Sequence, residues 1–133
     1  MGQQLQELLD SSPRIKPAIN QIEVHPFNTQ IAITSFCTQH NITIQAYAPL
    51  ARATRFKSPV MVELAKKYNV SPAQLMVRWS LQKGYVPLPK STRRERIEEN
   101  AKVDGFVIAD EDIRKLDGCD EGLVTDWDPT DAD

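Results

Sequence analysis

The chain has 133 residues, of which 41% are hydrophobic and 26% charged, and its formal net charge is −2. This length suits one domain, and the mild negative charge gives no reason to expect nucleic acid or an anionic membrane as a partner. No apolar run approaches the ~20 residues of a membrane-spanning helix, and residues 1–10 do not resemble a signal peptide, so we expect a cytoplasmic protein.

Helix and strand patterns alternate along the chain. Apolar residues recur every three or four positions in the expected helices, while the expected strands are short and mostly apolar. In chain order we expect a helix at 3–11, a strand at 18–24, a helix at 28–40, a strand at 42–47, helices that begin at 59 and 72, a strand at 85–88, and helices at 92–103 and 109–117. Residues 119–133 are expected to form an acidic, irregular tail that contains Trp127.

Polar residues mark the starts of three of these helices. Ser58 is a natural N-cap before Pro59, which fits a first helical turn. The segments SPAQ at 71–74 and TRRE at 92–95 have the spacing of capping boxes.

The helix that begins at 72 is expected to be largely buried. Its polar side chains form a narrow stripe, and most of its other side chains are apolar. The stripe consists of Gln74, Arg78 and Gln82. Gly84 is expected to end the helix.

The chain has two cysteines, Cys37 and Cys119. They do not have the spacing of a CxxC motif or of a metal site that combines cysteine and histidine. We therefore expect two reduced thiols and no metal.

Alternation of strands and helices predicts a parallel sheet covered by helices. Only three strands can be identified, so the sheet would have two open edges through which the chain is expected to self-associate. A closed (β/α)8 barrel needs about 250 residues. The sequence therefore corresponds to about half of such a barrel.

Four cationic residues follow the third expected strand: Lys90, Arg93, Arg94 and Arg96. They lie where a strand ends and a helix begins, and the free N–H groups of a helix start favour an anion. Cations in a first helical turn oppose the helix dipole, at a cost of roughly 0.3–1 kcal/mol each when exposed. A bound phosphate would explain them, since arginine suits it by bidentate geometry. The alternative is a solvated helix start balanced by Glu95, Glu98 and Glu99.

Two further segments place notable side chains at the ends of expected strands. In NQIEVHP at 20–26, His25 is a candidate general acid, but a histidine before a proline at a strand end is more often a packed structural residue. In AYAPL at 46–50, the ring of Tyr47 can either stack on a flat heterocycle or face the core. Both segments fall on the side where (β/α)8 barrels place their sites.

In the same order and with comparable spacings, these segments resemble the aldo-keto reductase family. NQIEVHP resembles the family's sixth strand, AYAPL its seventh strand with the following loop, and LPKSTRRERIEEN at 88–100 its signature after the eighth strand. PAQLMVRWSLQKG at 72–84 is similar to a conserved helix of the family. The resemblance implies an α/β fold, namely strands 6–8 of a TIM barrel with their helices, and the tail is similar to that of fungal members.

The resemblance also implies an NADP(H) site. Gln21 would hold the nicotinamide carboxamide, and Tyr47 would stack on the nicotinamide ring. The N–H groups of Leu50 and its neighbours would hold the pyrophosphate, because Ala48 stands where the family often has a serine. Contacts to the 2′-phosphate and the adenine are then expected from Lys90, Ser91, Thr92, Arg96, Glu99 and Asn100.

By the same resemblance, the family's catalytic Asp, Tyr, Lys and His precede this chain. Residues 1–133 are expected to form a partial oxidoreductase domain with a tail at 119–133, to contain no catalytic residue and to be inactive alone. The full enzyme would reduce a small carbonyl substrate, an aldehyde or a ketone, with NADPH. The alternatives are a non-catalytic nucleotide-binding half-domain and an interaction protein that reuses the fold.

Overall fold

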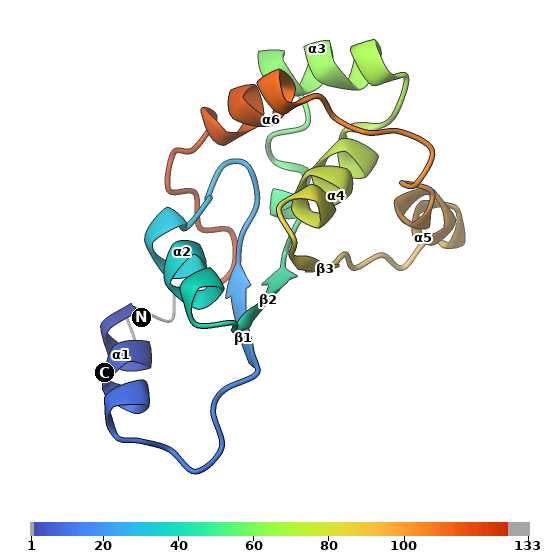
Figure 1. Cartoon of the computed structure of the whole chain (residues 1–133). Helices are drawn as coiled ribbons and strands as arrows, with labels where there is room; N and C mark the ends of the chain where they lie inside the picture. Colours follow the sequence, from blue (N-terminus) through green and yellow to red (C-terminus); the bar gives the residue numbers. More distant parts are fainter. Residues whose placement is uncertain (1, 128–133) are drawn as a thin grey trace.

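The computed structural model describes residues 2–127 and contains a three-stranded parallel sheet in the order β1-β2-β3. The strands are β1 (Ile19–Glu23), β2 (Thr43–Tyr47) and β3 (Val86–Leu88). The helices are α1 (Gly2–Asp10), α2 (Ile31–Gln39), the 3-10 turn η1 (Ala51–Ala53), α3 (Pro59–Tyr68), α4 (Pro72–Gln82), α5 (Arg94–Ala101) and α6 (Asp110–Asp117). The expected elements are therefore all present in the expected order, within a few residues of their expected bounds (Figure 1).

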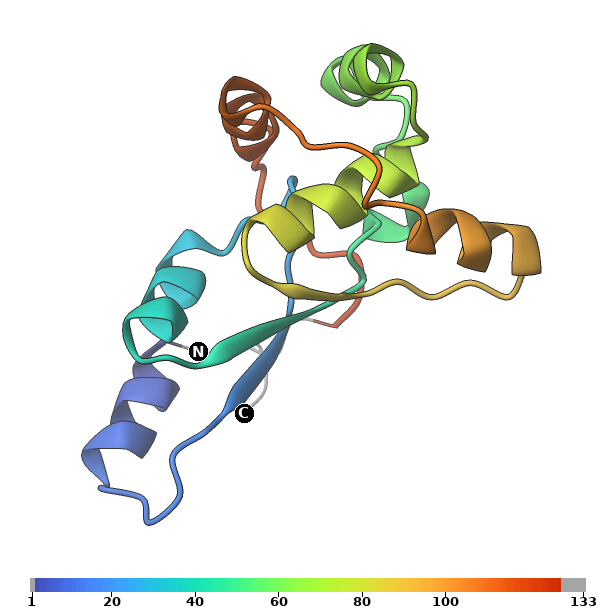
Figure 2. The ribbon, with the colours of Figure 1, turned by 45° about the vertical axis from the view of Figure 1, so that its right-hand side comes forward.

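The helices pack on one face of the sheet. Helix α2 contacts β2, α4 contacts β3, and α3 and α6 pack together further out (Figures 1 and 2). The core between these elements contains Ile22, Ile44, Ala46, Met61, Leu64, Leu75 and Trp79. The helices therefore bury one face of the sheet, and on the opposite face the last residue of β1, Glu23, is also buried.

The other face of the sheet remains open. Ile19 pairs with Thr43 and Gln45 pairs with Val86, so their side chains share that face. Ile19 is 51% exposed and Val86 is 43% exposed, although both are apolar. The three strands do not close on themselves, as the sequence predicted.

Helix α4 confirms the expectation of a buried helix with a polar stripe. Leu75, Met76 and Trp79 are buried, whereas the stripe holds the chain between α5 and α6. Gln74 Nε2 donates to the carbonyls of Glu99 and Lys102, Arg78 donates to that of Val103, and Gln82 bonds both the N–H and the carbonyl of Ile108. The stripe therefore satisfies backbone groups in the last turn of α5 and in the irregular segment that follows it.

Two helix ends were predicted correctly in detail. Ser71 and Gln74 form the complete capping box at the start of α4. At its other end Gly84 has a φ of +80°. The N–H groups of Gly84 and Tyr85 donate to the carbonyls of Leu81 and Ser80, which is the Schellman arrangement.

Two other helix starts differ from expectation, and a third has the expected position without a side-chain cap bond. Helix α2 begins at Ile31 rather than at residue 28, because the backbones of His25 and Asn28 bond each other in a tight turn. The TRRE capping box is wrong, since Arg93 is the N-cap of α5 and makes no side-chain cap bond. Ser58 is the N-cap of α3 by position, but its side chain makes no cap bond either.

The segment that follows α6 folds back towards β1. The N–H groups of Glu121 and Leu123 both donate to the carbonyl of Phe27, and Thr29 hydrogen-bonds the Asp120 carboxylate. This attachment carries residues 120–127, here called the C-terminal segment, across the carboxyl ends of β1 and β2 (Figure 1). Residue 1 and residues 128–133 of the expected domain and its tail lie outside the described residues.

Candidate functional site

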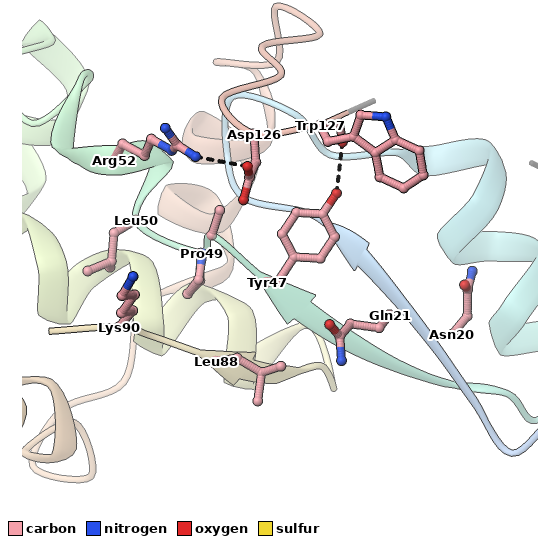
Figure 3. A pocket seen from close by; sticks show the side chains of 11 residues that line it. Asn20, Gln21, Tyr47, Pro49, Leu50, Arg52, Leu88, Lys90, Asp126 and Trp127 are labelled. Carbon is pink, nitrogen blue, oxygen red and sulfur yellow. Dashed lines mark hydrogen bonds and ion pairs between the residues drawn. The ribbon is translucent and has the colours of Figure 1, made fainter. Parts of the chain in front are cut away.

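Two adjoining hollows lie at the carboxyl ends of the strands, with volumes of 960 and 530 Å³. Leu50, Arg52 and Lys90 line both hollows and so join them into one groove. The first hollow contains Gln21, Tyr47, Ala48 and Trp127 (Figure 3), and the second is also lined by Ser91, Thr92, Arg96, Glu99 and Asn100. The fold thus brings all ten residues expected to bind the cofactor to the wall of one groove.

The topology of the sheet explains this gathering. The strands are parallel, so β2 and β3 end at the same edge, and the loops that follow them lie side by side there. Tyr47 is the last residue of β2, and Leu88 is the last residue of β3. Tyr47 and Leu88, which are 41 positions apart in the chain, therefore line the same hollow.

The loop after β2 has an unusual backbone. Ala48, Ala51, Arg52 and Ala53 all have positive φ, between 45° and 62°. Each such conformation in a residue other than glycine costs roughly 1 kcal/mol, and strain of this kind gathers at binding sites. The N–H groups of Ala51 and Ala53 donate to carbonyls within the loop. Those of Leu50 and Arg52 have no acceptor in the described part of the chain, so they are available to a ligand.

The cations at the start of α5 differ in their partners. Arg94 donates to Glu98 at 2.9 Å, as the solvated alternative required. Within residues 2–127, Lys90, Arg93 and Arg96 take part in no ion pair. The N-cap of α5 makes no side-chain bond, so the first-turn N–H groups also lack a cap. Uncompensated positive charge therefore collects beside the second hollow, which favours the phosphate interpretation.

The first hollow is bounded on one side by the C-terminal segment. The Tyr47 hydroxyl donates to the carbonyl oxygen of Trp127 at 3.1 Å, and Arg52 pairs with Asp126 at 2.8 Å (Figure 3). Across the sheet, Gln21 Nε2 donates to Gln45 Oε1 at 2.9 Å. Tyr47 faces the groove rather than the core, which decides between its two predicted placements.

Glu23 and His25 form a buried pair behind this hollow. The Glu23 carboxylate accepts hydrogen bonds from the N–H and the hydroxyl of Thr125 and from the N–H of Asp126. Burial alone would raise the pKa of Glu23, but these bonds and the one to His25 outweigh burial and hold its pKa below the ordinary value. Glu23 is therefore ionised at neutral pH.

His25 fits the structural interpretation rather than that of a general acid. Its side chain is fully buried, and its Nε2 lies 3.0 Å from Glu23 Oε1. An ionised carboxylate can only accept, so Nε2 carries the proton. Burial lowers the pKa of His25, and the neighbouring Glu23 offsets only part of that effect. The ring does not line either hollow of the groove.

A second buried carboxylate joins helices α3 and α6. Asp112 accepts hydrogen bonds from Lys67 and Tyr68, both at 2.6 Å, and lies 3.5 Å from Lys115. The hydrogen bond from Lys67 contributes most to lowering the pKa of Asp112, followed by the one from Tyr68. This group lies on helices outside the sheet and does not line the groove. We assign it to the packing of α3 against α6.

Arg52, Asp126 and Trp127 were not among the residues expected to bind the cofactor. Arg52 lies two residues after the predicted segment AYAPL, so a slightly longer segment would have included it. Asp126 and Trp127 reach the groove only through tertiary contacts more than 70 residues apart in the chain. No local pattern in the sequence carries that information.

None of the helices within residues 2–127 has the length and apolar character needed to cross a membrane. Across the same residues, His, Cys, Asp and Glu side chains form no group suited to a metal ion.

Residues 3–121 match the family model described as Aldo/keto reductase family. An oxidoreductase of Schizosaccharomyces pombe is 46% identical over 125 residues, which are 94% of this chain and 46% of that protein. A glyoxal reductase of Bacillus subtilis is 38% identical over 117 residues, 88% of this chain and 42% of that protein. The chain thus spans about half the length of the curated relatives it matches.

A solved structure extends the likeness to the fold. The complex of a Gox0644 variant with NADPH superposes with a TM-score of 0.91 at 32% identity, and covers 100% of this chain and 49% of that one. The three strands with their helices are therefore an α/β piece of a TIM barrel whose sheet is not closed. That finding confirms the predicted fold class.

Proposed function

Because the chain belongs to the aldo/keto reductase family, we propose that it is the NADP(H)-binding half of a reductase that converts an aldehyde or a ketone to an alcohol. The glyoxal reductase among its relatives supports a small carbonyl compound as the substrate. The NADPH complex of the Gox0644 variant supports the cofactor. We propose the cytoplasm as its location, on its composition and its two free cysteines.

The single observation that carries the cofactor proposal is the set of unpaired cations beside the second hollow. Lys90 and Arg96 line that hollow together with the Ser91 and Thr92 hydroxyl groups and the uncapped start of α5. These groups suit a doubly charged phosphate monoester, because arginine and free N–H groups donate to its oxygens. NAD(H) lacks the 2′-phosphate. We therefore propose NADP(H) over NAD(H).

The remaining residues suit the rest of the dinucleotide in the order in which they line the groove. Glu99 and Asn100 would contact the adenine, and the available N–H group of Leu50 next to Ala48 would bind the pyrophosphate. The ring of Tyr47 would support the nicotinamide, and the Gln21 amide would hold its carboxamide. The proposal is supported by the chemical groups that line the two adjoining hollows.

When bound, NADPH supplies a hydride to the carbonyl carbon, and an acid must protonate the carbonyl oxygen. His25 is neither in the groove nor free to act as that acid, since its proton is held by Glu23. We propose that the acid and its partners belong to the other half of the barrel. The chain alone is then expected to bind nucleotide weakly and to have no reductase activity. NADPH-dependent reduction of a carbonyl compound by the purified chain would contradict the proposal that the catalytic residues lie in the other half.

The test of the proposed site is the replacement of Arg96. Arg96→Ala should weaken NADPH binding about tenfold and leave NADH binding unchanged, because a lost charge-assisted bond to the 2′-phosphate affects NADPH only. Arg94→Ala is the matched control, since Arg94 pairs with Glu98 on the same helix and should change neither affinity. Titration calorimetry measures the affinities of the wild type and of both variants for the two nucleotides. Equal losses for both nucleotides in Arg96→Ala would remove the 2′-phosphate assignment.

A further inference from the structure

The C-terminal segment, residues 120–127, forms one wall of the first hollow through Asp126 and Trp127. Figure 3 shows both residues above Tyr47, on the side of the groove away from Leu88. Trp127 is 63% exposed there and lines the hollow, so its indole ring is not part of the core. The position of this wall depends on what holds residues 125–127.

A single buried side chain holds residues 125 and 126. Glu23 is 3% exposed, and its carboxylate accepts from the Thr125 N–H at 2.9 Å, from the Thr125 hydroxyl and from the Asp126 N–H at 3.1 Å. His25 adds a fourth donor at 3.0 Å from inside the core. Hydrogen bonds to an ionised acceptor are about twice as strong as neutral ones. Glu23 thus fixes two successive peptide units of the segment to β1.

This anchor reaches the nicotinamide end of the groove through one further residue. Trp127 directly follows the anchored pair, and its carbonyl oxygen accepts from the Tyr47 hydroxyl at 3.1 Å. The side chain of Asp126 meanwhile pairs with Arg52 in the loop after β2. A shift of residues 125 and 126 would therefore move the acceptor that holds the Tyr47 ring.

We propose that Glu23 is the positioning residue of the nicotinamide end of the groove. It acts by fixing residues 125–127, so that Trp127 and the hydrogen-bonded ring of Tyr47 form a preorganised surface for the nicotinamide. The inference rests on the proposed function, because it assumes that a nicotinamide nucleotide lies in this groove. The carboxylate itself stays behind the segment and touches neither substrate nor cofactor.

The effect of Glu23 is local to one end of the groove. Within residues 2–127, no hydrogen bond or ion pair joins the C-terminal segment to residues 90–100. The affinity for a ligand that occupies only the phosphate end should therefore not change when the hydrogen bonds of Glu23 are lost. Adenosine 2′,5′-bisphosphate is such a probe, because it carries the 2′-phosphate and the adenine but no nicotinamide.

The test compares NADP⁺ with adenosine 2′,5′-bisphosphate on the full chain and on Glu23→Gln. Glutamine keeps the size of the side chain but loses the charge, and its NH₂ group cannot accept from the segment. We expect NADP⁺ affinity to fall about tenfold and the affinity for the bisphosphate to stay within about twofold. A chain of 133 residues suits titration by amide chemical shifts, which also measures weak binding.

The two tryptophans provide a readout that a general loss of stability would not mimic. Trp79 is fully buried and donates to Asp117 at 2.8 Å, so its indole resonance reports the core. The Trp127 indole resonance should shift with NADP⁺ but not with the bisphosphate in the wild-type chain. In Glu23→Gln that NADP⁺ shift should shrink, while the Trp79 resonance stays in place.

Two further variants keep the test decisive. Thr125→Val removes one hydrogen-bond donor to Glu23 at a partly exposed position. It should lower the affinity for NADP⁺ selectively, and by less than Glu23→Gln does. Glu121→Gln is the matched control, since it makes the same chemical change in the same segment but breaks only the exposed pair with Arg55. It should leave both affinities unchanged.

Each outcome has one meaning. Unchanged NADP⁺ affinity in Glu23→Gln and Thr125→Val overturns the inference. If Glu23→Gln lowers the affinity for both ligands equally, the result for Thr125→Val decides. A loss of affinity in Thr125→Val that is not selective for NADP⁺ also overturns the inference. If the wild-type chain binds neither ligand, the proposed function fails and the inference with it. If the wild type binds both and Glu23→Gln loses neither, only the inference fails.

Discussion

At the scale of single residues, the buried carboxylates of Glu23 and Asp112 have different structural roles. Glu23 holds a segment more than 100 residues away in the chain, whereas Asp112 holds two neighbouring helices together through Lys67 and Tyr68. Both lie in surroundings that favour the ionised form, since the pKa of each is lowered by its hydrogen bonds. Stability therefore depends on their charge.

Asp112 leads to a prediction about pH. Its folded pKa lies below the unfolded value of about 3.9, so its contribution is fully present above that pH and is lost as pH falls through the folded pKa. Asp112→Asn should lower the free energy of unfolding by about 2 kcal/mol at pH 7. It should also flatten the decline of that free energy below about pH 4. Urea unfolding at pH 7 and at pH 3.5 measures both effects.

The control for this prediction is Asp104→Asn, which alters a carboxylate that is 94% exposed. It should change the free energy of unfolding by less than about 0.5 kcal/mol at either pH. If Asp112→Asn keeps the wild-type dependence on pH, the buried carboxylate does not contribute to it.

At the scale of elements, the ends of α4 show which local signals hold. Its capping box and its terminal glycine were predictable because each depends on residues three to five positions apart. The TRRE segment has the same spacing, yet its threonine does not cap α5. There Ser91 accepts from the Arg93 N–H and so sets the N-cap one residue later. The spacing of the TRRE segment could not distinguish a helix capped by Thr92 from one capped by Arg93, and the hydrogen bond between Ser91 and Arg93 favours the second.

Gly84→Ala tests the end of α4. A φ of +80° is costly for alanine, so the substitution should lower the free energy of unfolding by about 1 kcal/mol. Gly105→Ala is the control, because no atom lies within 4 Å of the added Cβ and the backbone there is not left-handed. Denaturant titration of the two variants compares them directly. Equal effects would mean that the Schellman arrangement contributes nothing measurable.

The candidate site, like the helix ends, was predictable only in part. The ten residues expected to bind the cofactor all line the groove, since their motifs lie at strand ends that parallel pairing brings together. Their role as cofactor ligands remains a prediction. The wall made by Asp126 and Trp127 was not foreseen, because it depends on hydrogen bonds to Glu23 and Tyr47 across the whole chain.

At the scale of the whole molecule, the open sheet is the dominant feature. One face carries Ile19, Val86 and Leu88, which are apolar and between 39% and 51% exposed. The outer edges of β1 and β3 also present backbone groups without a neighbouring strand among residues 2–127. Sheet edges of this kind pair with other chains. In a full barrel, the strands of the other half would cover both the face and the edges.

We therefore predict that the isolated chain self-associates through this sheet. Ile19→Lys places a charge on the open face at one edge and should shift the population toward monomer in sedimentation velocity experiments. Ile31→Lys is the control: Ile31 is 65% exposed but lies on α2, away from the sheet edges. If both variants associate as the wild type does, the association does not use the sheet.

The anchor between Glu23 and Thr125 also sets an order of events during synthesis. The proposed phosphate end of the groove uses residues 90–100, which pack through α5 on α4. The proposed nicotinamide end needs residues 125–127, which are the last residues of the groove to be synthesised. The residues of the proposed phosphate end therefore leave the ribosome before those that complete the other end of the groove.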